Sequence, residues 1–135
     1  MHTPTVFLVE DEQSLRTLVR KVLERFGCRV VEASSGANAL EKWEQKKAQI
    51  DLLLTDLMLP DGMNGRDLAE KLLQDNPNLK VVFTTGYSYD EACKGMPLPD
   101  GFHFLQKPYP PSTLLQTIKI ALTAKKPLPQ PAVAA

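Results

Sequence analysis

The sequence predicts an α/β fold in which a five-stranded parallel sheet carries helices on both faces. Five short apolar runs alternate with segments whose apolar residues have the three- and four-residue spacing of amphipathic helices. The run at residues 50–56 is apolar on both faces, which is typical of a central strand covered by helices on both sides. Right-handed crossovers between such strands restrict the topology to a doubly wound sheet.

Boundary residues support the individual elements. Gly27 follows a regular apolar stripe, as a glycine that ends a helix does. Ser34, Ser35 and Asn64 are suitable N-caps, and Pro111 stands where the first turn of the last helix is expected. Strands are therefore expected at 5–10, 28–32, 50–56, 79–85 and 102–106, and helices at 12–26, 34–47, between 64 and 77, and from 110 to about 122.

Two segments are less regular. Residues 88–101 contain Gly95, Pro97 and Pro99, which leave room for only about two helical turns, so a shortened fourth helix is expected. Residues 125–135 contain three prolines and little core-forming pattern, which is typical of a linker or disordered tail. We therefore expect a single domain at residues 1–124.

Composition excludes several classes of function. The chain has 135 residues, 16 basic and 16 acidic, with no basic block, so nucleic acid is not an expected partner. Its apolar runs are far shorter than the ~20 residues that span a bilayer, so no membrane contact is expected. Cys28 and Cys93 lack the spacing of a zinc site or a disulfide framework. The chain is expected to be soluble and cytoplasmic.

Polar residues stand at the carboxyl ends of four predicted strands. These ends share one edge of a parallel sheet, so residues far apart in the sequence should converge there. Carboxylates brought together need a compensating cation, and oxygen ligands suit Mg²⁺. A lysine and a hydroxyl group at the same edge could bind phosphate oxygens, and an aspartate beside them could attack a phosphoryl donor. The residues concerned are Glu10, Asp11, Asp56, Thr84, Thr85 and Lys107.

These motifs resemble the receiver domains of two-component response regulators. The resemblance rests on the acidic pair Glu10-Asp11, on Asp56 followed by LMLPDGMNG, on Thr85-Gly86 and on Lys107-Pro108. It covers about residues 5 to 123 and implies a flavodoxin-like (βα)5 fold with strand order 2-1-3-4-5. The TGY triplet at 85–87 and the run after Asp56 look most like receivers carried by hybrid sensor histidine kinases. A stand-alone regulator agrees equally well.

The resemblance also implies roles. The chain would be a signalling domain rather than an enzyme, would take a phosphoryl group from a histidine kinase or histidine phosphotransfer protein, and would be a monomer or weak dimer. Its cofactor would be Mg²⁺ or Mn²⁺. Asp56 would accept the phosphoryl group. Asp11, Asp56 and the Met58 carbonyl would bind the metal directly, and Glu10 would bind it through water. Thr85 and Lys107 would contact the phosphoryl oxygens, Phe104 would turn inward as a switch, and the peptide bond before Pro108 would be cis.

The sequence departs from the family pattern at three places, and three other functions can be compared with it. Glu10 replaces the commoner aspartate, the loop after Asp56 is one residue longer than usual, and the broken fourth helix argues against dimerisation through it. An aspartyl-phosphate phosphatase would need a second aspartate where Met58 stands. Nucleotide binding would need a glycine-rich first turn in place of the acidic one. A degenerate receiver that acts as a phosphorylation-independent interaction module remains an alternative.

Overall fold

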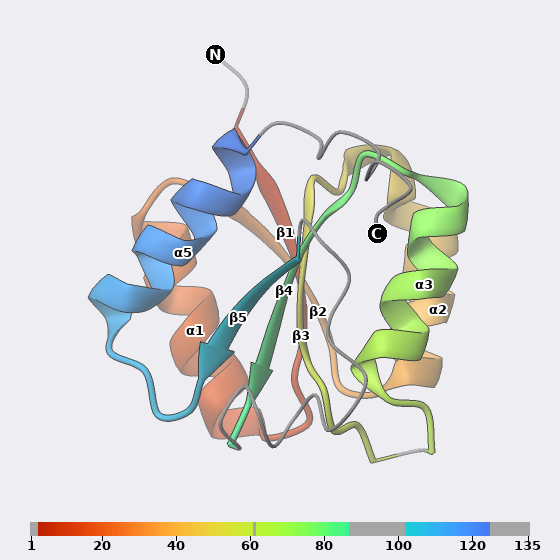
Figure 1. Ribbon diagram of the computed structural model, residues 1–135, viewed down its shortest axis with the longest axis horizontal. Helices are drawn as coiled ribbons and strands as arrows, with labels where there is room; N and C mark the ends of the chain where they lie inside the picture. The colour runs from red at the N-terminus through yellow and green to blue at the C-terminus, as the bar shows by residue number, and fades with distance from the viewer. Residues whose placement is uncertain (1–2, 61, 87–101, 125–135) are drawn as a thin grey trace, which may run out of the picture.

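The computed structural model describes residues 3–60, 62–86 and 102–124, and in this part of the chain it contains one five-stranded parallel sheet (Figure 1). The strand order is β2-β1-β3-β4-β5, which confirms the predicted doubly wound topology. The expected fourth helix at 88–101 and the tail at 125–135 lie outside the described residues. The elements are β1 Thr5–Val9, α1 Gln13–Arg25, β2 Arg29–Ala33, α2 Gly36–Lys46, a 3-10 turn Lys47–Gln49, β3 Leu52–Asp56, α3 Gly65–Asp75, β4 Lys80–Thr85, β5 Phe102–Gln106 and α5 Pro111–Thr123.

Helices cover both faces of the sheet, with α1 and α5 on one side and α2 and α3 on the other (Figure 1). Alternate residues of β1 serve the two sides: Phe7 and Val9 pack with α2 and α3, whereas Val6 and Leu8 pack with α1 and α5. All five residues of β3 are buried, as expected for a central strand of a parallel sheet. The sheet is therefore a rigid support between two apolar layers.

Local signals place the helices close to where they were predicted. The Ser35 hydroxyl accepts a hydrogen bond from the Asn38 amide at 3.1 Å and so caps α2. The Asn64 side chain accepts one from the Asp67 amide at 2.7 Å and caps α3. Gly27 follows α1 with φ = +98°, a left-handed conformation that glycine adopts without strain. The strand and helix ends differ from the predicted ones by one or two residues, as helix and strand ends generally do.

The strand register sets the positions of the polar residues. Val9 of β1 pairs with Thr55 of β3, so the next residue of each chain segment, Glu10 and Asp56, emerges at the same height. Thr85 of β4 pairs with Gln106 of β5, and Lys107 follows directly. The three charged residues therefore reach the carboxyl edge of the sheet from three different strands, where open α/β sheets have their ligand sites.

Candidate functional site

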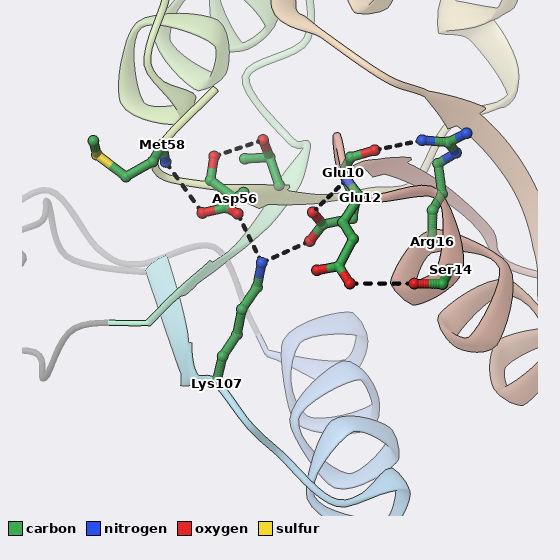
Figure 2. Close-up of polar contacts among 8 residues, drawn as sticks. Glu10, Glu12, Ser14, Arg16, Asp56, Met58 and Lys107 are labelled. Atoms are coloured by element: carbon green, nitrogen blue, oxygen red, sulfur yellow. Dashed lines mark hydrogen bonds and ion pairs between the residues drawn. The ribbon is translucent and has the colours of Figure 1, made fainter. Parts of the chain in front are cut away.

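Lys107 joins two buried carboxylates at the carboxyl edge of the sheet (Figure 2). Its ammonium nitrogen lies 2.7 Å from Asp56 Oδ2 and 2.8 Å from Glu10 Oε1. Glu10 is 3% exposed and Asp56 is 7% exposed, so water solvates neither carboxylate well. Buried charges of this kind are stable only when they are paired and hydrogen-bonded. Lys107 supplies that pairing.

Backbone amide groups hold each carboxylate in place. The Met58 N–H donates to Asp56 Oδ1 at 3.1 Å, and the Glu12 N–H donates to Glu10 Oε2 at 3.0 Å (Figure 2). Each side chain therefore has one oxygen on an amide and the other on the Lys107 ammonium. Hydrogen bonds to an ionised acceptor are short and strong, and they fix the orientation of the carboxylate.

The electrostatics of the cluster follow from burial and pairing. Burial raises the pKa of Glu10 above its ordinary value, although hydrogen bonds from Lys107 and the Glu12 amide oppose that effect. Burial also disfavours the Lys107 ammonium, but its hydrogen bonds to Asp56 and Glu10 outweigh this, and the net pKa is raised. Lys107 therefore stays charged at neutral pH.

Asp11 completes an acidic group of three. It is exposed, unlike its two neighbours, and one carboxylate oxygen from each of Glu10, Asp11 and Asp56 lies within 4.8 Å of the others. The donor set consists only of carboxylate oxygens, which suits a hard divalent cation such as Mg²⁺ with water in the other coordination positions. The residues present therefore fit the cation that the family resemblance implies.

The loop after Asp56 is anchored at both ends. The Leu57 N–H donates to the Thr84 carbonyl of β4 at 2.9 Å, and the Gly65 N–H donates to the Leu57 carbonyl at 2.9 Å. Gly62 lies between the two anchors and has φ = +83°, a conformation that favours glycine. The two hydrogen bonds therefore tie the start of the loop to β4 and its end back to Leu57.

The other residues singled out from the sequence lie around this centre. Thr85 is buried at the end of β4, and its carbonyl accepts the Lys107 N–H at 2.7 Å. Met58 is 62% exposed and lies two residues after Asp56 in the chain (Figure 2). Phe104 is partly buried against the core between the sheet and α2 and α3. The Lys107–Pro108 peptide bond is cis.

Three residues near the site were missed in the sequence. Arg16 of α1 donates to the Glu10 carbonyl at 2.8 Å, and Tyr109 packs beside Lys107 in the core under α1 and α5. A Cβ atom on Gly65 would lie 2.2 Å from the Asp56 carbonyl oxygen. Arg16 and Tyr109 could not be singled out from the sequence, because no sequence motif marks a side chain that contacts a main-chain carbonyl or an apolar layer. The small residue at the start of α3 could have indicated the close approach of Gly65.

The fold and this edge of the sheet define a class of protein. Residues 6–119 match the response regulator receiver domain family. This match covers most of the chain, and the chain belongs to that family.

Relatives of two kinds resemble the chain. It is 36% identical over 115 residues to the sensor kinase CckA of Brucella abortus (strain 2308), covering 85% of this chain but only 12% of that protein. It is 31% identical over 119 residues to the response regulator receiver protein CpdR of the same organism, covering 88% of this chain and 97% of CpdR. The matched region is thus a small part of one relative and nearly all of the other.

Solved structures agree with the sequence relatives. A response regulator receiver protein from Sinorhizobium medicae WSM419 has a TM-score of 0.80 at 28% identity, with 90% of this chain and 96% of that chain covered. The receiver domain of the hybrid histidine kinase CckA has a TM-score of 0.75 at 31% identity, with 88% and 99% covered. Across residues 3–60, 62–86 and 102–124, none of the helices has both the length and the apolar character needed to cross a membrane.

Proposed function

We propose that this chain is a phosphoryl-accepting receiver domain and that Asp56 is the acceptor. The observation that carries the proposal is the 2.7 Å contact between Lys107 Nζ and Asp56 Oδ2 at the open edge of the sheet. An ammonium beside the attacking oxygen can bind an incoming phosphate and offset the charge that develops on it. The Met58 amide holds the other oxygen, so the carboxylate is oriented before a donor arrives.

The reaction would form a mixed anhydride. An Asp56 carboxylate oxygen attacks phosphorus, the bond from phosphorus to a donor histidine nitrogen breaks, and that imidazole leaves with the electron pair. Thr85 and Lys107 would hold the phosphoryl oxygens. Phe104 would turn inward when Thr85 engages the phosphoryl group, and so change the surface that a partner reads.

A divalent cation would be required. Asp11, Asp56 and the Met58 carbonyl would bind Mg²⁺ or Mn²⁺ directly, and Glu10 would bind through water. When bound, the cation would offset the charge of the carboxylates and the phosphate oxygens. The fit of the acidic group to such an ion supports this part of the proposal.

The phosphoryl donor would be a histidine kinase or a histidine phosphotransfer protein in the cytoplasm, and the chain would act by signalling rather than by turning over a separate substrate. The similarity to a sensor kinase and to a receiver protein supports this choice of donor. The receiver would span residues 1–124 and act as a monomer or weak dimer. The chain matches only 12% of CckA but 97% of CpdR, so the same receiver function is compatible with a stand-alone regulator and with one part of a larger kinase.

The test is the intact mass of the chain after incubation with acetyl phosphate and Mg²⁺. The parent should gain one phosphoryl group, and Asp56→Asn and a sample with excess chelator should gain none. Asp67→Asn is the matched control, because it makes the same change at an aspartate in the first turn of α3, outside the acidic group, and it should react like the parent. If the folded parent gains nothing and binds no beryllofluoride with Mg²⁺, the chain is instead a phosphorylation-independent interaction module.

A further inference from the structure

Arg16 connects helix α1 to the acidic pair that follows β1. Its NH1 group donates to the Glu10 carbonyl at 2.8 Å, and its Nε lies 3.4 Å from Glu32 Oε1 on β2 (Figure 2 shows the Glu10 contact). The side chain is only 17% exposed. A guanidinium group held by two acceptors, one just after β1 and the other on β2, has little freedom to move.

The carbonyl that Arg16 binds belongs to the peptide unit between Glu10 and Asp11. Fixing that oxygen fixes the orientation of the peptide plane, and therefore the directions in which both side chains leave the backbone. The same turn is held by the Glu12 amide on Glu10 Oε2 and by the Arg16 amide on the Glu12 carbonyl at 2.9 Å. Arg16 NH1 is a side-chain donor, whereas the other two donors are backbone amides, so the bond from Arg16 can be removed by a side-chain substitution.

We propose that Arg16 is a positioning residue for the divalent-cation site, acting through the Glu10–Asp11 peptide. The inference rests on the proposed function, because it assumes that Glu10 and Asp11 serve a bound cation. Groups that orient metal ligands commonly change metal affinity by about 10–100-fold when they are removed. Arg16 acts through the backbone, so we expect a loss of about tenfold, at the lower end of that range.

The sign of the effect separates positioning from charge. Arg16 is a cation close to an acidic group, so by Coulomb's law alone its removal should strengthen the binding of a divalent cation. If Arg16 instead orients the ligands, its removal should weaken binding despite that electrostatic gain. A weaker affinity therefore cannot come from the lost charge.

Arg20 provides a matched control. It lies one turn further along α1, and its Nε pairs with Glu32 Oε2 at 3.2 Å, while its NH1 pairs with Glu24 at 3.0 Å. Arg20→Met therefore removes a similar charge and a contact to the same glutamate, but it leaves the Arg16 bond to Glu10 in place. Any effect that arises from Glu32 or from the stability of α1 should appear in both variants.

The experiment is a titration of each protein with Mn²⁺, in which the electron paramagnetic resonance signal of free Mn²⁺ reports binding without any phosphoryl transfer. Arg16→Met should bind Mn²⁺ about tenfold more weakly than the parent, and Arg20→Met should stay within about twofold. Thermal unfolding of both variants is measured alongside. If Arg16→Met is unfolded, Arg16→Lys carries the test with the same direction expected, because it keeps the charge but lacks the planar guanidinium whose NH1 and Nε reach the Glu10 carbonyl and Glu32 in fixed directions.

Three outcomes would overturn the inference. Binding of Mn²⁺ by Arg16→Met as tight as that of the parent, or tighter, would leave Arg16 as an electrostatic neighbour only. Equal weakening in both variants would assign the effect to Glu32 or to α1. Failure of the parent itself to bind Mn²⁺ would refute the cation site of the proposed function, and the inference with it.

Discussion

The backbone of Gly65, the first residue of α3, lies directly against the backbone of Asp56. A Cβ atom at Gly65 would be 2.2 Å from the Asp56 carbonyl oxygen and 3.1 Å from the Cα of Leu57. Both neighbours are backbone atoms, so they cannot move aside as a flexible side chain could. Helix α3 and the end of β3 are therefore in contact without any intervening side chain, and the position of one depends on the other.

Replacing Gly65 by alanine should displace Asp56 from Lys107. We expect Gly65→Ala to lose about 1–3 kcal/mol of unfolding free energy, as overpacked sites do. Its rate of phosphorylation by acetyl phosphate should fall about tenfold to a hundredfold, because small displacements of reacting groups are costly. Urea denaturation and a mass-resolved time course measure the two effects.

Gly86→Ala is the stability control for that substitution. A Cβ there would meet no atom of the described residues within 4 Å, so its unfolding free energy should stay within about 0.5 kcal/mol of the parent. A Gly65→Ala protein with the parent's stability and rate would show that the contact with Asp56 is easily relieved.

Removing the Lys107 ammonium should leave two buried carboxylates unpaired. Because the side chain is 21% exposed, we expect Lys107→Met to lose about 1–3 kcal/mol at pH 7 in the presence of chelator, less than a fully buried pair would. Lys47→Met removes an exposed lysine paired with Glu44 and Asp75, and it should change stability by less than about 0.5 kcal/mol. Equal losses in the two variants would contradict the pairing described here.

The deficit of Lys107→Met should shrink in acid. The folded pKa of Glu10 is raised above its unfolded value of 4.5, so above that pH the folded chain holds more protons than the unfolded one. The contribution of Glu10 to stability therefore falls as the pH rises above 4.5. The fall should be larger in Lys107→Met, because Lys107 opposes the rise in the Glu10 pKa. Urea midpoints of parent and variant from pH 7 down to pH 5 measure the difference.

Tyr109 should give the protein a specific sensitivity to alkali. Burial raises its pKa from about 10 to about 12, and the nearby Glu10 and Asp56 carboxylates add to this against the opposing Lys107. Between these pH values the folded chain holds a proton that the unfolded chain has lost. Stability from Tyr109 is therefore fully present below pH 10 and falls by up to about 2–3 kcal/mol as pH rises to 12.

The comparison with Tyr109→Phe isolates that contribution. Both proteins keep Lys107, so the difference between their stabilities from pH 10 to 12 belongs to Tyr109. Absorbance at the tyrosinate band should also show that one of the three tyrosines of the parent titrates near pH 12. The variant should lack this titration step. Parallel stability curves for the two proteins would contradict the burial assigned to this phenol.

The sequence predicted the sheet because its signals are local. The apolar character of 50–56 on both faces indicated a buried central strand, and β3 is buried along its whole length. Asn64 and Ser35 indicated helix starts because an N-cap needs a specific side chain, and both cap as expected. The convergence of Glu10, Asp56 and Lys107 followed from strand topology alone.

The remaining features depend on tertiary geometry that the sequence does not encode locally. The contact of Arg16 with a main-chain carbonyl could belong to any surface arginine of α1, and the sequence offers no reason to choose it over Arg20. The closure of the loop after Asp56 is a second example. The Gly65 N–H donates to the Leu57 carbonyl at 2.9 Å, a backbone contact that no particular side chain specifies.

Of the three clustered acids, Asp56 is the one proposed to carry the phosphoryl group. The most direct test is borohydride reduction of the phosphorylated chain, followed by peptide mass mapping. Borohydride reduces an aspartyl phosphate to homoserine, so we expect homoserine at position 56 and unmodified residues at Glu10 and Asp11. Reduction at Asp11 or Glu10 with Asp56 unchanged would contradict it.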